Sequence, residues 1–280
     1  MRSVDVGEIA EGIARLAKDS NYRLDRGYVA YLEDALARED SPDARHILAE
    51  LLENAEAAAE DEAPLCQDTG VAVVFLEIGQ GVALTGGDLR RAVDEGVRRG
   101  YREGYLRSSV VRDPLMRENT GDNTPAVLHT EVVPGDRVIV HFLPKGAGSE
   151  NMSRATMLRP ADGREGVVDF VVDTVARAGA SACPPLTVGV GLGGTFDMAP
   201  LLSKRALLRP LGPENPAKHL AVLERDILRR INELGIGAGG FGGASTALAV
   251  HVLAHPCHIA SLPVAVNLQC HAHRVGTMRI

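Results

Sequence analysis

Three cysteines stand in sequence surroundings unlike the smooth apolar runs of a protein core. Cys66 opens the stretch Cys-Gln-Asp-Thr-Gly, Cys183 precedes two prolines, and Cys270 lies between Gln269 and a His-Ala-His-Arg run. A free cysteine is most often a small buried hydrophobe, but polar and turn-forming flanks favour a chemical role. We therefore predict that Cys66, Cys183 and Cys270 form one site.

The spacing of these cysteines limits the kind of site that they can form. The chain has no Cys-x-x-Cys pair, so a local zinc knuckle is excluded and only the fold can gather the thiols. Three thiolates without a fourth protein ligand suit a cubane iron–sulfur cluster with one iron open to substrate as a Lewis acid. A mononuclear zinc site with a bound water fits the same residues. For the fourth cysteine, Cys257, we expect a small buried side chain without a chemical role.

Composition argues against several kinds of partner. The 280 residues are 45% apolar, and no apolar run approaches the roughly 20 residues needed to cross a bilayer. The 37 acidic and 30 basic residues are interspersed and only 4% of residues are aromatic, so we expect neither nucleic acid nor a membrane as a partner. The N-terminal residues lack an apolar signal core, which predicts a cytoplasmic location.

The elements that must position the cysteines begin with helices. Amphipathic patterns predict helices over residues 5–18, 26–38 and 42–59. Pro64 ends the third helical pattern and delivers the chain directly to Cys66. The helical part of the chain is therefore expected to cover about residues 1–64.

The remainder, about residues 65–280, mixes strands and helices. Short β-branched runs predict strands at VAVVFLEIG, LTVGVGL and SLPVAV, and a β-hairpin at LHTEVV with RVIVHFLP. Helices are expected after Asp88, over residues 164–179, over PAKHLAVLERDILRRINELG and from about Met152, with an ordered loop at 112–126. We expect one α+β domain over residues 1–280, with the helical N-terminal region packed on a mixed β-sheet lobe and glycine-rich loops around a metal cluster.

One glycine run matches a dinucleotide-binding fingerprint in form. Residues 189–194 fit Gly-x-Gly-x-x-Gly after a strand, but a Rossmann unit needs an acid ending a second strand about 20 residues later. This chain has LGPENPAKH there. We therefore discount dinucleotide binding and expect these glycines to let the backbone pass close to the cluster.

Five motifs together resemble a known family. CQDTG, KGAGSEN, CPPLTVGVGLGGT, GFGGASTALAVHV and HIASLPVAVNLQCHAHR are similar, in order and spacing, to the α subunit or N-terminal domain of class I fumarate hydratases and L-tartrate dehydratases. The resemblance covers about residues 40–280. It implies a [4Fe-4S] cluster on Cys66, Cys183 and Cys270. It also implies reversible hydration of fumarate to (S)-malate, a step of the tricarboxylic acid cycle, with L(+)-tartrate dehydration as the alternative.

The resemblance further implies which residues contact the substrate. Gln67, Asp68, Arg107, Gly146 and His258 match positions that line the substrate pocket of the family. The side-chain chemistry is consistent with this role. Asp68 can exchange a proton with a hydroxyl, and the Arg107 guanidinium can bind a carboxylate. Without the resemblance, Asp68 would be interpreted as an Asx turn or helix cap, Arg107 as a solvated charge and His258 as a core residue.

The residues that follow Cys270 suggest a supporting role at the site, and the end of the chain suggests a partner subunit. His271, His273 and Arg274 are expected to support the site or a subunit contact. The chain stops at Ile280, whereas single-chain members of the family continue into a domain that supplies further arginine, lysine and a proton-transferring threonine. The resemblance therefore implies a separate β subunit, an α2β2 assembly and a small dicarboxylate substrate.

Two other classes of function stay open. A zinc-dependent hydrolase would need a nitrogen or carboxylate ligand beside the cysteines. A non-catalytic scaffold subunit would keep the core strands and glycines, and would tolerate the loss of Cys66, Cys183 or Cys270.

Overall fold

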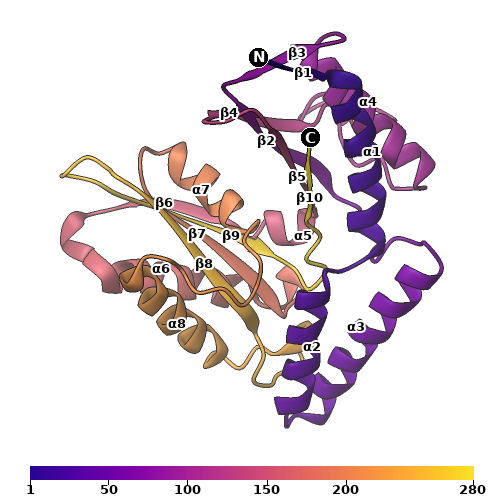
Figure 1. Ribbon diagram of the computed structural model, residues 1–280. Coiled ribbons are helices and arrows are strands. Elements are labelled where there is room, and N and C mark those ends of the chain that lie inside the picture. Colours follow the sequence, from indigo (N-terminus) through magenta and orange to yellow (C-terminus); the bar gives the residue numbers. More distant parts are fainter. The chain divides into compact units, whose positions relative to one another are not determined.

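The computed structural model describes residues 1–280. The chain forms two compact units (Figure 1). Unit 1 comprises Met1–Asp25, Ala55–Ala147 and Arg274–Ile280, and unit 2 comprises Arg26–Asn54 and Gly148–His273. Each unit combines helices with β-sheet around its own hydrophobic cluster, which confirms the α+β class. None of the helices combines the length and the apolarity that spanning a membrane requires.

Unit 1 is built on a four-stranded sheet of order β10-β5-β2-β4 and a parallel pair of β1 and β3. Its strands are β1 (Arg2–Asp5), β2 (Val71–Gly79), β3 (Val82–Thr85), β4 (Val127–Val133), β5 (Val138–Lys145) and β10 (Gly276–Arg279). Helices α1 (Val6–Tyr22) and α4 (Leu89–Glu103) pack against each other, as Figure 1 shows. Their apolar faces, with Ile13 and Val97 at the centre, join Val74 and Phe142 of the sheet in one core.

The β-hairpin predicted for β4 and β5 is wrong, because β2 lies between them. β4 pairs with β2 in parallel, and β5 pairs with β2 antiparallel. Residues 72–76 of β2 are all buried, which requires a neighbour on each edge, whereas β4 is mostly exposed and suits an edge position. The turn after β2 completes the arrangement, since the Gly79 N–H donates to the Arg137 carbonyl at 2.8 Å within the β4–β5 connection.

Unit 2 contains a mixed sheet of order β6-β9-β7-β8 with helices on both faces (Figure 1). Its strands are β6 (Arg154–Leu158), β7 (Leu186–Gly193), β8 (Ala247–His255) and β9 (Leu262–Gln269), and its helices are α2 (Arg26–Arg38), α6 (Gly163–Ala178), α7 (Met198–Ala206) and α8 (Lys218–Asn232). Short 3-10 turns lie at Pro160–Asp162, Gly179–Ala182 and Ala238–Gly240. Helices α3 (Pro42–Glu60) and α5 (Ala147–Glu150) contain residues of both units.

Gly189 and Gly191 of β7 leave room for helix α7 to pack closely on the strand. This corrects the interpretation that these glycines let the backbone pass close to a cluster. Val188 and Val190 belong to the core formed with α6 and α8, so the alternate positions Gly189 and Gly191 face α7. A Cβ on Gly189 would stand 2.1 Å from the Ser203 carbonyl oxygen, and one on Gly191 would meet a second α7 carbonyl at 2.0 Å. Close helix packing, and not a dinucleotide or a cluster, explains these two glycines.

The predicted helices occur, with one exception. α1, α2 and α3 fall where the amphipathic patterns placed them, and Asp88 caps α4 by accepting from the Arg91 N–H at 2.7 Å. The helix expected from about Met152 is wrong, because α5 ends at Glu150 and the chain enters β6. Exposure alternates along β6, which is the period of a half-buried strand and not of a helix.

A single buried carboxylate holds the glycine-rich segment 235–243 of unit 2. Glu39 is 3% exposed and accepts from two backbone N–H groups just after this segment, those of Ala244, at 2.9 Å, and Ser245, at 3.3 Å. Within the segment, the Gly239 N–H donates to the Pro184 carbonyl at 2.9 Å. Glu39 therefore fixes the loop that supports the chain next to Cys183.

Replacing Glu39 by Ala removes the acceptor and leaves the partly buried N–H groups of Ala244 and Ser245 without it. We expect the free energy of unfolding to fall by about 1–3 kcal/mol, measured by urea denaturation. The matched control is Glu33→Ala, because Glu33 is exposed on the preceding helix and its loss should change stability by less than about 0.5 kcal/mol. Equal effects of the two substitutions would contradict the role of Glu39.

Candidate functional site

The stretch from Cys66 to Gly70 forms a loop between α3 and β2, and Asp68 gives it its shape. One carboxylate oxygen, Oδ1, accepts from the Gly70 N–H at 3.0 Å, which is the Asx turn that the residue type favours. The other oxygen, Oδ2, accepts from the Ala147 N–H at 2.8 Å and ties the loop to the residues that follow β5. The Asp68 carboxylate is half-buried, and both oxygens are held in one orientation.

Arg107 is fixed beside this loop through its main chain. The Thr69 hydroxyl accepts from the Arg107 N–H at 2.9 Å and donates to the Arg107 carbonyl at 3.2 Å. The Arg107 side chain is exposed, as is that of Gln67, whose Oε1 accepts from the half-buried Cys66 thiol at 3.3 Å. The loop thus presents a thiol and an amide, and Arg107 presents a guanidinium beside them.

Two buried side chains support the loop from below. The Tyr101 hydroxyl donates to the carbonyls of Thr69 and Gly70 at 2.9 and 3.1 Å, and Asn123 donates to the Gly70 carbonyl at 3.1 Å. Burial raises the pKa of the Tyr101 hydroxyl above its ordinary value, so the group stays protonated and keeps donating. These bonds satisfy carbonyls that the irregular loop would otherwise leave unpaired in the interior.

Gly146 lies where a carboxylate and a guanidinium converge. A Cβ at this position would stand 3.2 Å from Asp68 Oδ2 and 3.3 Å from Arg274 Nη2, which is tighter than nearly all real Cβ contacts. Gly146 is itself buried. The absence of a side chain therefore lets Asp68 and Arg274 approach the same point.

In unit 2, strand register brings Cys183 and Cys270 to one end of the sheet. β7 and β9 pair antiparallel with Thr187 opposite Gln269, so the residues before β7 and after β9 are neighbours. The His271 N–H donates to the Cys183 carbonyl at 3.1 Å across this junction. Two of the three predicted cysteine ligands are therefore adjacent within one unit.

Cys183 also has an unusual backbone conformation. Its φ of 55° and ψ of 67° place it in the left-handed region, which a residue with a side chain rarely adopts. Such conformations carry strain of about 1–3 kcal/mol and persist where the surroundings impose them, often at functional sites. The Cys183 side chain is exposed and Cys270 is half-buried, so both thiols are accessible.

Tyr28 of α2 lies beside Cys270. Its ring stacks on that of His273 with centroids 5.1 Å apart, and Tyr28 is 1% exposed. Burial, and then the negative charge of a Cys270 thiolate, raises the pKa of the Tyr28 hydroxyl. His273 thus supports the surroundings of Cys270, as its sequence position suggested.

His258 lies away from these cysteines within unit 2. It sits in the turn between β8 and β9, exposed, with Nδ1 accepting from the Ala260 N–H at 3.1 Å. The eight residues of β9 separate it from Cys270, a length of roughly 26 Å at about 3.3 Å per residue. Cys257 in the same turn is exposed, so the expectation that it is buried is wrong.

The predicted ligand set is divided between the units. Cys66 belongs to unit 1, and Cys183 and Cys270 belong to unit 2. No group of three or more His, Cys, Asp or Glu side chains lies close enough together to hold a metal ion. The donor chemistry of the residues nevertheless fits an iron–sulfur cluster, because all three are cysteines outside any disulfide and thiolates are the ligands that such clusters use.

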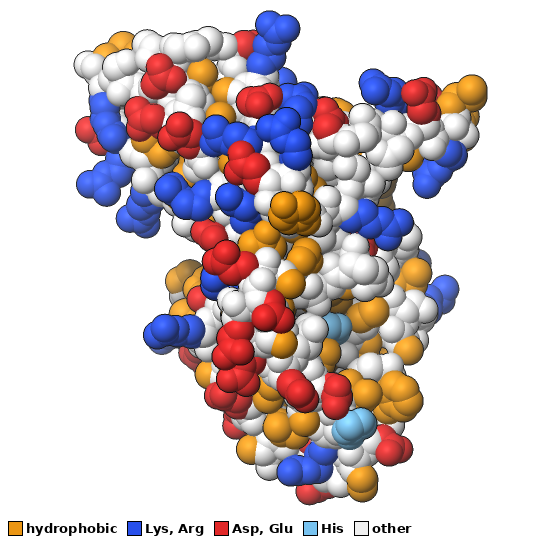
Figure 2. All heavy atoms as spheres, turned by 90° about the vertical axis from the view of Figure 1, so that its right-hand side faces the viewer, with side chains coloured by type: hydrophobic (Ala, Val, Ile, Leu, Met, Phe, Trp, Pro, Cys, Tyr) orange, Lys and Arg blue, Asp and Glu red, His pale blue; other side chains and the backbone are white.

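The loop of residues 112–126 is ordered, as predicted, and is tied to α4. Asp122 forms an ion pair with Arg98 at 2.9 Å. Partial burial opposes ionisation of Asp122, but hydrogen bonds from Thr124 and Arg98 outweigh it and lower the pKa of Asp122 to about 2. Figure 2 shows acidic and basic side chains intermixed on the face that it draws.

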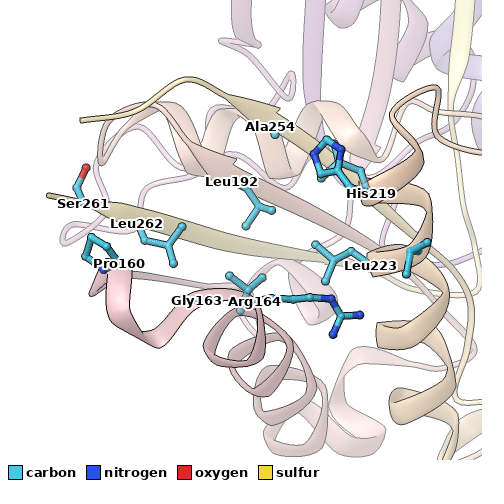
Figure 3. Close-up of a pocket in the computed structure, with 12 residues that line it drawn as sticks. Pro160, Gly163, Arg164, Leu192, His219, Leu223, Ala254, Ser261 and Leu262 are labelled. Atoms are coloured by element: carbon cyan, nitrogen blue, oxygen red, sulfur yellow. The ribbon is translucent and has the colours of Figure 1, made fainter. Parts of the chain in front are cut away.

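A separate pocket of about 730 Å³ opens in unit 2 between α6, α8 and the sheet (Figure 3). Leu192, Leu223 and Leu262 form its apolar lining, and none of the predicted site residues contributes to it. Arg164 on its rim is already paired with Asp226 at 2.8 Å. His219 and Ser261 are the other polar side chains of a lining that is otherwise apolar (Figure 3).

Comparison with known proteins gives consistent matches. The family model described as "Fumarate hydratase (Fumerase)" matches residues 10–279. A Methanocaldococcus jannaschii protein named "Putative L(+)-tartrate dehydratase subunit alpha" is 42% identical over 282 residues, covering 98% of both chains. The L(+)-tartrate dehydratase subunit alpha of Escherichia coli (strain UTI89 / UPEC) is 31% identical over 278 residues, covering 98% of this chain and 91% of that protein.

These matches define a class of enzyme, the hydro-lyases, which add water to a double bond or remove it. The chain belongs to the fumarate hydratase (fumerase) family. The resemblance carried by the five motifs is thereby confirmed over almost the whole chain.

Sequence reasoning missed or undervalued three buried side chains at the site, Asn21, Tyr28 and Arg274. Asn21 lies beyond the predicted end of the first helix, so its place on the buried face of α1 was hidden. Tyr28 was counted only as an apolar member of an amphipathic pattern. Arg274 was assigned a supporting role near Cys270, whereas its contacts are to Asp68 and Asn21.

Replacing Gly146 by Ala should displace the Asp68 carboxylate by a few tenths of an ångström. Because reacting groups tolerate little misplacement, we expect the kcat of the assembled enzyme to fall roughly tenfold to a hundredfold. The Ala147 N–H donates to Asp68, so its amide hydrogen should exchange with solvent faster in this variant.

The matched control is Gly148→Ala, where the nearest atom to the new Cβ lies at an ordinary 3.5 Å. This variant should keep both kcat and the exchange rate of the Ala147 amide. If Gly146→Ala behaves like Gly148→Ala, the close approach at Gly146 has no catalytic importance.

Proposed function

We propose that this chain is the α subunit of an iron–sulfur-dependent hydro-lyase that reversibly hydrates fumarate to (S)-malate. One observation carries the proposal. Asp68 lies in the loop that bears Cys66, and its carboxylate is held by the N–H groups of Gly70 and Ala147. A base fixed two residues from a proposed cluster ligand could exchange a proton with a substrate hydroxyl held beside it.

The cofactor proposed is a [4Fe-4S] cluster held by Cys66, Cys183 and Cys270. When bound, such a cluster supplies a Lewis-acidic iron without a protein ligand. Support comes from three cysteines outside any disulfide and from the adjacency of Cys183, just before β7, and Cys270, just after β9. The chain's own residues must supply substrate binding and proton transfer.

Substrate binding is assigned to the side chains of the Cys66 loop and to Arg107 beside it. The exposed Arg107 guanidinium can bind a substrate carboxylate with two parallel hydrogen bonds, and its main chain is locked by Thr69. The Gln67 amide can donate to a further substrate oxygen, and Gly146 leaves room beside Asp68. His258 remains a substrate-binding prediction from the resemblance.

Proton transfer is assigned to Asp68. In hydration, oxygen from water bonds to one alkene carbon and a proton bonds to the other; in dehydration both bonds break. Asp68 can take the proton that the attacking water loses and return it to the departing hydroxyl. The proton that adds to carbon is then expected from the partner chain.

The partner proposed is a β subunit, in an α2β2 assembly. Support comes from the relatives in Methanocaldococcus jannaschii and Escherichia coli, whose names designate alpha subunits and whose lengths this chain nearly matches. A β subunit would supply the remaining substrate contacts, so the isolated chain should turn over little or no substrate.

L(+)-tartrate is the second candidate substrate. The family description favours fumarate, whereas the names of the similar relatives favour tartrate. The two acids that would lose water, (S)-malate and L(+)-tartrate, differ by one hydroxyl at the reacting carbons, and a site built to hydrogen-bond that hydroxyl discriminates strongly. The rates with each substrate therefore decide between them.

The test is anaerobic purification of the chain with its β subunit, followed by rates with fumarate, (S)-malate and L(+)-tartrate. We expect (S)-malate from fumarate with a higher kcat/KM than for tartrate, and no turnover by the chain alone. Asp68→Asn should lower kcat by about 10²–10⁴ at unchanged iron content, because it removes the proton acceptor.

A higher kcat/KM for tartrate would select the second candidate. An iron-loaded complex that turns over neither acid would overturn the hydro-lyase assignment to these substrates. Stoichiometric zinc in place of iron would favour a zinc-dependent hydrolase, and a stable metal-free chain would favour a scaffold.

A further inference from the structure

Arg274 is among the largest fully buried side chains of the protein, at 1% exposed. It belongs to unit 1 and lies in the segment between Cys270 and β10. Charged side chains are almost never fully buried unless they are paired. No carboxylate forms an ion pair with Arg274, and its Nε has no hydrogen-bond partner. A stability role alone does not account for a buried guanidinium placed in this way.

The hydrogen bonds that Arg274 does make converge on the Cys66 loop. Nη1 donates to the Asp68 carbonyl at 2.7 Å and to Asn21 Oδ1 at 2.9 Å. Asn21 is 0% exposed, and its main-chain carbonyl accepts from the Leu65 N–H at 2.8 Å. Asn21 and Arg274 therefore clamp the chain at Leu65 and at Asp68, on either side of Cys66.

The other guanidinium nitrogen faces the same space as the Asp68 side chain. Nη2 stands 3.3 Å, and Asp68 Oδ2 stands 3.2 Å, from the point that a Cβ of Gly146 would occupy. Arg274 thus holds the main chain of Asp68 directly, while its charge faces the Asp68 carboxylate across Gly146. The guanidinium does not reach solvent and is unsuited to binding substrate itself.

We propose that Arg274 is a positioning residue for catalysis, which fixes Asp68 in the orientation required for proton transfer. This inference rests on the proposed function, in which Asp68 exchanges the proton. Its chemical basis is the planar guanidinium, whose Nη1 donates to two acceptors while Nη2 faces the Asp68 carboxylate. The single nitrogen of a lysine ammonium cannot occupy both positions. Removing it frees the Asp68 main chain without removing a substrate contact.

The test compares Arg274→Lys and Arg274→Gln in the anaerobic two-chain enzyme, with Arg279→Gln as the control. Arg279 lies on β10 in the same segment and is exposed. We expect kcat to fall roughly tenfold in Arg274→Lys and roughly a hundredfold in Arg274→Gln. KM should change less than about threefold in both, because positioning of Asp68 affects the reaction more than it affects substrate binding. Iron content and melting temperature of the Lys variant should match the control.

A second readout separates this inference from the proposed function. Amide hydrogen exchange at Gly70 and Ala147, the two donors to Asp68, should be at least tenfold faster in the Arg274 variants than in Arg279→Gln. Faster exchange in an enzyme inactive on all three acids would refute the proposed substrates but support the clamp. Unchanged exchange, unchanged kcat at full iron content, or a loss of kcat that only follows lost iron would overturn the role of Arg274.

Discussion

The structure of unit 1 near the site depends on the hydrogen bonds that converge on Asp68. Its two carboxylate oxygens accept from Gly70 and Ala147, and its carbonyl accepts from Arg274. Because two of these donors, Ala147 and Arg274, come from distant parts of the chain, they tie the loop that bears Cys66 to the rest of unit 1. Tyr101 satisfies the Thr69 and Gly70 carbonyls, so hydrogen bonds hold these carbonyls although the loop is irregular.

Unit 2 solves a different problem, which is to bring together two cysteines that are distant in sequence. Antiparallel pairing of β7 with β9 places the start of one strand beside the end of the other. The glycine-rich segment held by Glu39 then supports the chain at Pro184 and allows Cys183 its left-handed backbone. Strand register and one buried carboxylate therefore define this pair of thiols, as the loop hydrogen bonds define Cys66.

The sequence predicted most elements, because their periodic patterns are local. It failed where neighbours decide the outcome: β4 and β5 looked like a hairpin, yet the wholly apolar β2 needs partners on both edges. The motif residues Cys66, Cys183 and Cys270 were recognisable from their polar flanks. Arg274 was not assigned to Asp68, since nothing local reveals that a guanidinium contacts a carbonyl 206 positions earlier. For the same reason, the separation of His258 from Cys270 emerged only from the sheet.

Cys66, Cys183 and Cys270 are proposed to bind one cluster. The most direct measurement is iron and acid-labile sulfide per chain after anaerobic reconstitution, for each cysteine replaced singly by Ser. The wild type and Cys257→Ser should hold about four irons, as expected for a [4Fe-4S] cluster, while each of the other three variants loses most of its iron and sulfide. Full iron and sulfide in Cys66→Ser, Cys183→Ser or Cys270→Ser would contradict the account.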